Sequence, residues 1–164
     1  MKDAPLRSAL EELAGRDADF ARAYALVGLP PKRGQRAGFA ALIGTICSQQ
    51  MSTASSRAIM GRLNESVKKL EPKAFLTLDD GALSKIGFSR QKISYCRILA
   101  EAVTSGQLSF RALESLSDEA VVDELTKLKG IGRWTAEIYL LFALKRPDVW
   151  PVGDLALVIA VQRL

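Results

Sequence analysis

Between two helical patterns, residues 128–136 form a short turn that reads LKGIGRWTA. Gly130 and Gly132 lie one residue apart, which lets the chain reverse tightly, and Ile131 between them can pack into a pair of helices. Backbone N–H groups at such a turn, where a helix begins, can bind a phosphate oxygen without reading any base. The turn therefore predicts either a plain connection between two helices or a helical hairpin that binds phosphate.

The rest of the chain has the apolar spacing of helices, and no stretch alternates as a half-buried strand does. We therefore expect an all-α fold, a single helical domain over residues 1–164 with no β domain. Apolar helices are predicted at residues 39–46, from Ser52 to about Leu63, and from Ser89 towards Gly106. The expected N-caps are Asp3, Asp17, Ser52, Asp79 or Asp80, Ser89 and Ser117, and Gly28 and Gly87 can end helices.

The composition excludes several kinds of chemistry. The 164 residues contain no histidine, which rules out histidine metal sites and catalytic triads with an imidazole base. Cys47 and Cys96 are too few to bind a zinc ion or an iron-sulfur cluster alone, and their apolar surroundings predict two buried thiols. With no signal-peptide pattern and no long uncharged apolar run, we expect a soluble cytoplasmic protein without a membrane partner.

Positive charge is concentrated in the middle of the chain. The whole sequence has a formal net charge of +5, but residues 31–100 alone carry twelve Lys and Arg against four Asp and Glu. Such an excess favours a polyanionic partner such as DNA, although a solvated basic helix face remains an equal alternative.

Three motifs together resemble a known family. They are ICSQQMS at 46–52, GIGRWTA at 130–136 and RPDVWPVGD at 146–154. They resemble the helix-hairpin-helix, Gly/Pro-rich loop and aspartate signature of the base-excision DNA glycosylase superfamily, and within it the alkylated-base group of the 3-methyladenine DNA glycosylase II type. The likeness extends over about residues 35–164. It implies a monomeric DNA repair enzyme that flips alkylated purines out of double-stranded DNA and hydrolyses the glycosidic bond.

Asp154 is the predicted catalytic residue. It directly precedes the apolar run LALVI and is therefore expected to cap a helix, a role that by itself would explain an aspartate here. Helix N-terminal amides also favour the charged carboxylate, which can stabilise the oxocarbenium character of the sugar or orient the attacking water. The resemblance places the catalytic aspartate of the family at this position.

Trp134 distinguishes two mechanisms. The resemblance implies that members which also cut the strand carry a lysine nucleophile at this hairpin position. An indole is no nucleophile, so we expect a monofunctional enzyme that uses water, with Trp134 stacking against a flipped cationic base. The alternative for Trp134 is an ordinary core aromatic, a role that is compatible with stacking. Tyr139 and Trp150 are further base-pocket candidates, although their spacing is more typical of core residues.

The resemblance also assigns DNA contacts. It places a wedge that fills the gap left by the flipped nucleotide at Gln50, with Met51 less favoured and a polar helix end as the alternative. The predicted hairpin contacts are Lys129, Gly130, Gly132, Arg133 and Thr135. No metal or other cofactor is expected, although the resemblance allows a monovalent cation at the hairpin carbonyls.

The chain departs from the family pattern at both ends. Nothing in residues 1–34 predicts the β-rich domain that some members carry, and the one or two helices that normally follow the aspartate in the family are expected to be missing. We therefore expect Val158, Ile159 and Val161 to be partly exposed. The alternative function is a noncatalytic helix-hairpin-helix DNA-binding module, and a minor one is a glycosylase/lyase that uses another lysine.

Overall fold

The computed structural model of the chain describes residues 4–31 and 34–163, and every regular element within these ranges is a helix. The predicted all-α fold is confirmed. The proposed N-cap Asp3 and the basic pair Lys32 and Arg33 lie outside the described residues. None of the described helices is long and apolar enough to cross a membrane.

The chain divides into two compact units. One, the hairpin unit, consists of residues 34–151, and the other, the terminal unit, combines residues 1–33 with residues 152–164. The single domain that the sequence suggested stays a prediction.

The hairpin unit contains eight α-helices and one π-helical segment among its described residues. They are α3 (Phe39–Ser48), α4 (Thr53–Ser66), α5 (Pro72–Leu76), α6 (Asp80–Ile86), α7 (Arg90–Thr104), α8 (Phe110–Ser115), α9 (Asp118–Thr126), α10 (Arg133–Tyr139) and η1 (Leu140–Leu144). The predicted caps Ser52, Ser89 and Ser117 accept a backbone N–H at the start of α4, α7 and α9. Asp79, rather than Asp80, caps α6, and Gly87 ends it in the left-handed conformation.

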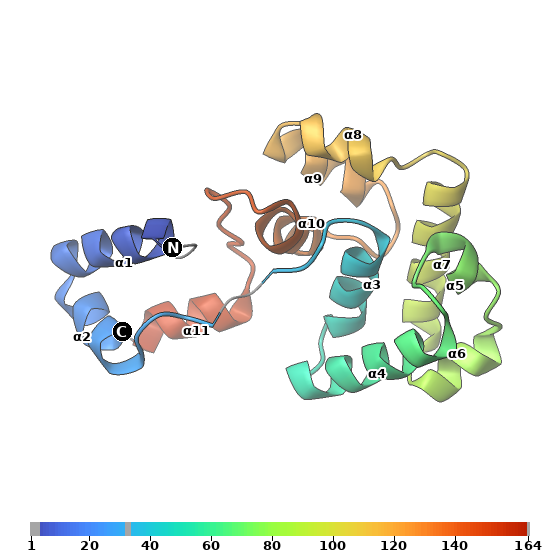
Figure 1. Cartoon of the computed structure of the whole chain (residues 1–164), viewed down its shortest axis with the longest axis horizontal. Helices are drawn as coiled ribbons and strands as arrows, with labels where there is room; N and C mark the ends of the chain where they lie inside the picture. The colour runs from blue at the N-terminus through green and yellow to red at the C-terminus, as the bar shows by residue number, and fades with distance from the viewer. Residues whose placement is uncertain (1–3, 32–33, 164) are drawn as a thin grey trace. The chain divides into compact units, whose positions relative to one another are not determined.

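Helix α3 forms the centre of the hairpin unit. Seven of its ten residues are buried, and it packs against α4, α7 and α10 (Figure 1). It runs two residues past its predicted end, so that Cys47 lies within it, and Cys47 and Cys96 are both buried free thiols, as expected. Burial raises the pKa of the Cys96 thiol to about 12. These cysteines therefore behave as small core residues.

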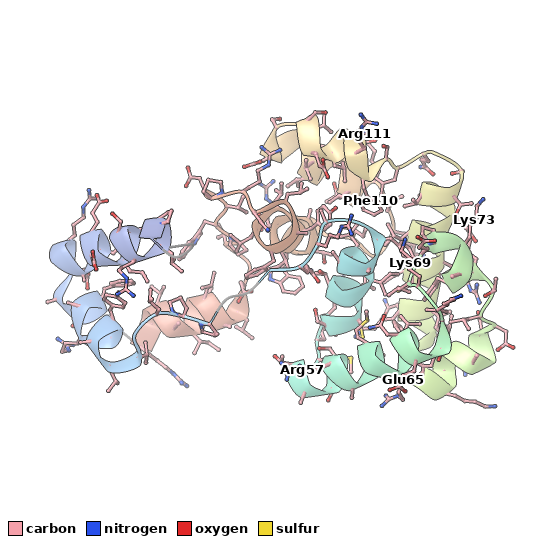
Figure 2. All side chains as sticks on the ribbon, viewed as in Figure 1. Arg57, Glu65, Lys69, Lys73, Phe110 and Arg111 are labelled. Carbon is pink, nitrogen blue, oxygen red and sulfur yellow. The ribbon has the colours of Figure 1, made fainter. Side chains whose placement is uncertain are left out.

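Basic side chains extend from several helices of the same unit. Figure 2 shows Arg57 on α4, Lys73 on α5 and Arg111 on α8 as labelled examples. Not all of the charge is available to a partner, because Arg97 pairs with Asp80 at 2.6 Å. Both sequence interpretations of the basic region, a DNA-facing surface and a solvated helix face, remain open.

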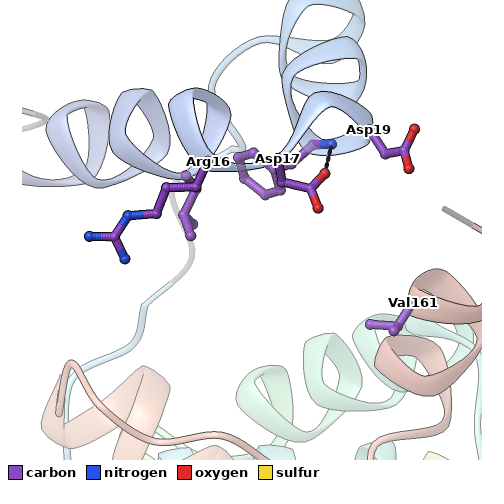
Figure 3. A pocket seen from close by; sticks show the side chains of 6 residues that line it. Arg16, Asp17, Asp19 and Val161 are labelled. Atoms are coloured by element: carbon purple, nitrogen blue, oxygen red, sulfur yellow. Dashed lines mark hydrogen bonds between the residues drawn. The ribbon is translucent and has the colours of Figure 1, made fainter.

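The terminal unit consists of α1 (Ala4–Arg16), α2 (Ala18–Val27) and α11 (Leu155–Arg163). Asp17 caps α2, as predicted, by accepting the Phe20 N–H at 2.7 Å (Figure 3). Beside this cap lies an open pocket of about 360 Å³ that Val161 also lines. Val158, Ile159 and Val161 are exposed, as the sequence suggested.

Candidate functional site

The hairpin joins α9 to α10 through residues 127–132. Gly130 has a φ of +95°, and a Cβ atom at this position would lie 2.0 Å from Cγ of Tyr95, so only glycine fits. Gly132 has a φ of −91°, and the space beside it is open. The left-handed conformation of the turn therefore lies at Gly130, whereas the backbone of Gly132 would suit other residues as well. Ile131 is buried, as predicted, and donates its N–H to the Leu128 carbonyl at 3.0 Å.

The two basic residues of the hairpin differ in their surroundings. Lys129 is exposed and has no ion pair within the described part of the chain. Arg133 pairs with Glu119 of α9 through both terminal nitrogens, at 2.9 and 3.1 Å, and with Glu137 of α10 through Nε at 2.9 Å. Hydrogen bonding to Arg133 and its charge lower the pKa of the Glu119 carboxyl. Arg133 therefore joins the two hairpin helices, and a phosphate would have to compete with two carboxylates.

The hydroxyl of Thr135 faces the interior. Thr135 is 2% exposed, and its Oγ1 accepts a hydrogen bond from Nε2 of Gln49 at 3.0 Å. The same nitrogen donates to the Gly130 carbonyl at 2.9 Å. This placement disfavours the predicted phosphate contact of Thr135. It also shows that Gln49, for which no local pattern predicts a role, links the end of α3 to the hairpin.

The predicted wedge lies in a tight turn after α3, formed by residues 48–51, which we call the wedge loop. The Met51 N–H closes the turn on the Ser48 carbonyl at 3.2 Å, and Gln50 at its tip has a φ of +53°. A left-handed conformation costs a residue with a Cβ atom about 1–2 kcal/mol. Gln50 is exposed whereas Met51 is partly buried against the core. The exposure favours Gln50 over Met51 as the wedge, which stays a prediction.

Lys92 is a second residue that the sequence analysis missed. It lies on α7 beside core residues, is partly buried, and donates from Nζ to the carbonyls of Cys47 at 2.6 Å and Gln49 at 2.8 Å. The sequence feature that could have indicated this role is the position of a lysine beside the apolar residues Ile93 and Cys96. Lys92 thus caps the C-terminal end of α3 from another helix.

The three aromatic candidates have different environments. Trp134 lies partly buried on α10, and Trp150 is 63% exposed. Tyr139 is fully buried, packs against Phe110, and accepts the Gly38 N–H on its hydroxyl at 3.0 Å. Burial raises the pKa of Tyr139 to about 12. This environment favours the core role for Tyr139 over a base contact, while the pocket roles of Trp134 and Trp150 stay predictions.

Asp154 caps α11, as predicted. Its Oδ1 atom accepts the N–H groups of Ala156 at 2.9 Å and Leu157 at 3.1 Å, and its side chain is partly buried. The two hydrogen bonds fix the orientation of the carboxylate. No group of three or more acidic or cysteine side chains that could hold a metal ion occurs among the described residues.

Residues 43–164 match the model of the HhH-GPD superfamily base excision DNA repair proteins. The chain belongs to this superfamily. DNA-3-methyladenine glycosylase 1 of Schizosaccharomyces pombe is 34% identical over 152 residues, which are 88% of this chain and 67% of that protein. The alkylbase DNA glycosidase-like protein mag2 of the same yeast is 31% identical, over 73% of this chain and 59% of its own length.

A solved structure supports the assignment of this chain to the HhH-GPD superfamily. The S. pombe 3-methyladenine DNA glycosylase Mag1, in complex with abasic DNA, superimposes with a TM-score of 0.84 and 34% identity, over 91% of this chain and 76% of that one. The family, its all-α fold and the alkylated-base glycosylase group predicted from the sequence are confirmed. This HhH-GPD chain spans about three fifths to two thirds of the two yeast relatives' lengths.

Proposed function

We propose that this HhH-GPD protein is a monofunctional DNA N-glycosylase that excises alkylated purines of the 3-methyladenine type from double-stranded DNA. It acts as a monomer in base excision repair. The observation that carries the proposal is the Asp154 carboxylate, held by two amides at the start of α11 in a chain of this family. The names of the two S. pombe relatives, and the abasic-DNA complex of one of them, support the substrate class.

The chemistry needs one carboxylate and one water molecule. The alkylated base leaves C1′ with the electron pair of the glycosidic bond, so a base that was cationic departs neutral and the sugar gains oxocarbenium character. The negative charge of Asp154 stabilises that developing positive charge. A water molecule then forms the new C1′–O bond and loses a proton, for which a carboxylate is a suitable acceptor.

Trp134 supports the monofunctional mechanism. An indole offers no amine for a Schiff base, while its face attracts an electron-poor cationic purine. The same hairpin carries the exposed Lys129, whose ammonium is suited to a phosphate oxygen. A monovalent cation at the hairpin would have to share the carbonyls of Leu128 and Gly130 with the N–H groups that they already accept, which their second lone pairs allow.

Mass spectrometry of bases released from methylated, deaminated and oxidised duplex DNA tests the proposal. We expect release of methylated purines by the wild-type protein, loss of release in Asp154→Asn, and equal duplex affinity for both. If Asp154→Asn released bases at nearly the wild-type rate, the proposed catalytic role of Asp154 would be wrong. Salt-dependent duplex binding with no base released from any lesion would show the noncatalytic module instead, and a borohydride-trapped covalent adduct would show a lyase.

A further inference from the structure

The Gln49 side chain connects two segments that are far apart in the sequence. Its amide nitrogen donates to the Gly130 carbonyl in the hairpin turn and to Thr135 on α10, which lie 81 and 86 positions away. Because a carbonyl oxygen can only accept, the nitrogen of the amide must face Gly130. Both N–H donors of the side chain therefore point into the hairpin, and the second residue of the wedge loop is anchored there.

Lys92 holds the same residue from the other side. Its ammonium group donates to the main-chain carbonyls of Cys47 and Gln49, at the end of α3 where the helix dipole favours a cation. One turn further along α7, Tyr95 lies against Gly130. One face of α7 thus contacts both the wedge loop and the hairpin.

The residue that directly follows these anchors is Gln50, which is exposed and strained. Its φ of +53° lies in the left-handed region, which a residue with a Cβ atom keeps only where its surroundings impose it. Two hydrogen bonds from Lys92 and two from Gln49 supply such surroundings on the N-terminal side of the turn.

We propose that Gln49 and Lys92 are positioning residues that fix the wedge loop to the hairpin, so that Gln50 enters the base stack at a set distance from the phosphate that the hairpin binds. The inference rests on the proposed glycosylase function. Small errors in placing a reacting group cost large factors in rate, and a wedge that moves independently of the phosphate contact would populate the flipped state less.

The test uses variants that remove donors and change little else. Gln49→Met removes the amide without changing charge, and Gln107→Met is its control, because Gln107 is exposed and has no hydrogen bond within the described residues. Lys92→Met removes the ammonium group, whereas Lys92→Arg keeps charge and donors. The DNA is a duplex with a tetrahydrofuran abasic analogue next to 2-aminopurine, whose fluorescence rises when its stacking is lost.

We expect Gln49→Met and Lys92→Met to bind this duplex about tenfold more weakly than wild type, the loss that about 1.4 kcal/mol produces. At protein concentrations that saturate the duplex, the fluorescence rise should still be reduced in both, and retained in Gln107→Met and Lys92→Arg. A merely structural role would lower the melting temperature without changing the signal of the saturated complex. If Gln49→Met or Lys92→Met is too unstable to assay, the fluorescence of the complex with the other variant tests the proposal.

Two results would overturn the proposal: full fluorescence of saturated complexes with both donor variants, or no fluorescence change with the wild-type protein. Neither depends on catalysis, because the abasic analogue has no base to release. A wild-type protein that changes the fluorescence yet releases no base from methylated DNA would instead contradict the proposed activity and leave the positioning role standing.

Discussion

The aromatic ring of Tyr95 lies directly against Gly130, so closely that a Cβ atom at residue 130 would come within 2.0 to 2.5 Å of three ring carbons. The turn also has its left-handed φ at this glycine. Helix α7 and the hairpin can therefore pack together only because residue 130 has no side chain. Glycine is required at this position both for the turn and for the contact with Tyr95.

Gly130→Ala should destabilise the protein strongly. The left-handed conformation and the overlap with Tyr95 together predict a loss of about 2–4 kcal/mol in the free energy of unfolding. Urea denaturation followed by circular dichroism measures this loss. An alanine variant within about 0.5 kcal/mol of wild type would contradict the described packing.

Gly132→Ala is the matched control and tests a different property. Its φ of −91° suits alanine and nothing lies within 4 Å of the added Cβ atom, so stability should change by less than about 1 kcal/mol. If a phosphate approaches the backbone here, the extra methyl group should weaken duplex binding. Unchanged affinity would show that the phosphate lies elsewhere.

Lys129→Met and Arg133→Met should affect DNA binding differently. Loss of a phosphate contact at Lys129 lowers the slope of log affinity against log salt by about one. Arg133 is bound to Glu119 and Glu137, so its replacement should leave that slope nearly unchanged and lower the melting temperature instead. Equal changes of slope in both variants would show that Arg133 leaves its carboxylates when DNA binds.

The Glu119 ion pair predicts a pH dependence of stability. Arg133 holds the pKa of the Glu119 carboxyl below its usual value of about 4.5, so the pair stabilises the folded state at neutral pH and this contribution disappears as the pH falls below that value. Glu119→Gln should melt at a lower temperature than wild type at neutral pH, and the difference should vanish in acid. If the difference in melting temperature persisted in acid, the ion pair between Glu119 and Arg133 would not be the cause of the stabilisation.

Tyr139→Phe separates the core role of Tyr139 from a base-pocket role. It leaves the Gly38 N–H without its acceptor, which should cost about 1–2 kcal/mol of stability. Tyr95→Phe is the control, because among the described residues that hydroxyl has the exposed Gln91 amide as its one partner, and it should cost no more than about 0.5 kcal/mol. Base release per folded molecule should be unchanged in Tyr139→Phe, and a specific loss would restore the pocket role.

Several helix starts followed from the sequence because a cap acts over a short range. Each predicted cap accepts the N–H group three residues further along the chain, so the residue type and the following apolar pattern suffice to predict the cap. These caps are Asp17, Ser52, Asp79, Ser89 and Ser117. The Asp154 cap was predictable on the same ground. Family motifs, which preserve residue order, likewise located the hairpin and the wedge loop.

Only the tertiary structure decided which polar groups of these motifs have partners inside the protein. Gln49 reaches 81 positions along the chain, Lys92 reaches 45, and Tyr139 accepts from a residue 101 positions away. Such hydrogen bonds depend on how α3, α7 and α10 pack, which no local pattern encodes. The sequence alone determined the all-α class, several capped helices, the family and the residues available for chemistry. Packing determined that Thr135 and Tyr139 face inward and that Gln50 faces solvent.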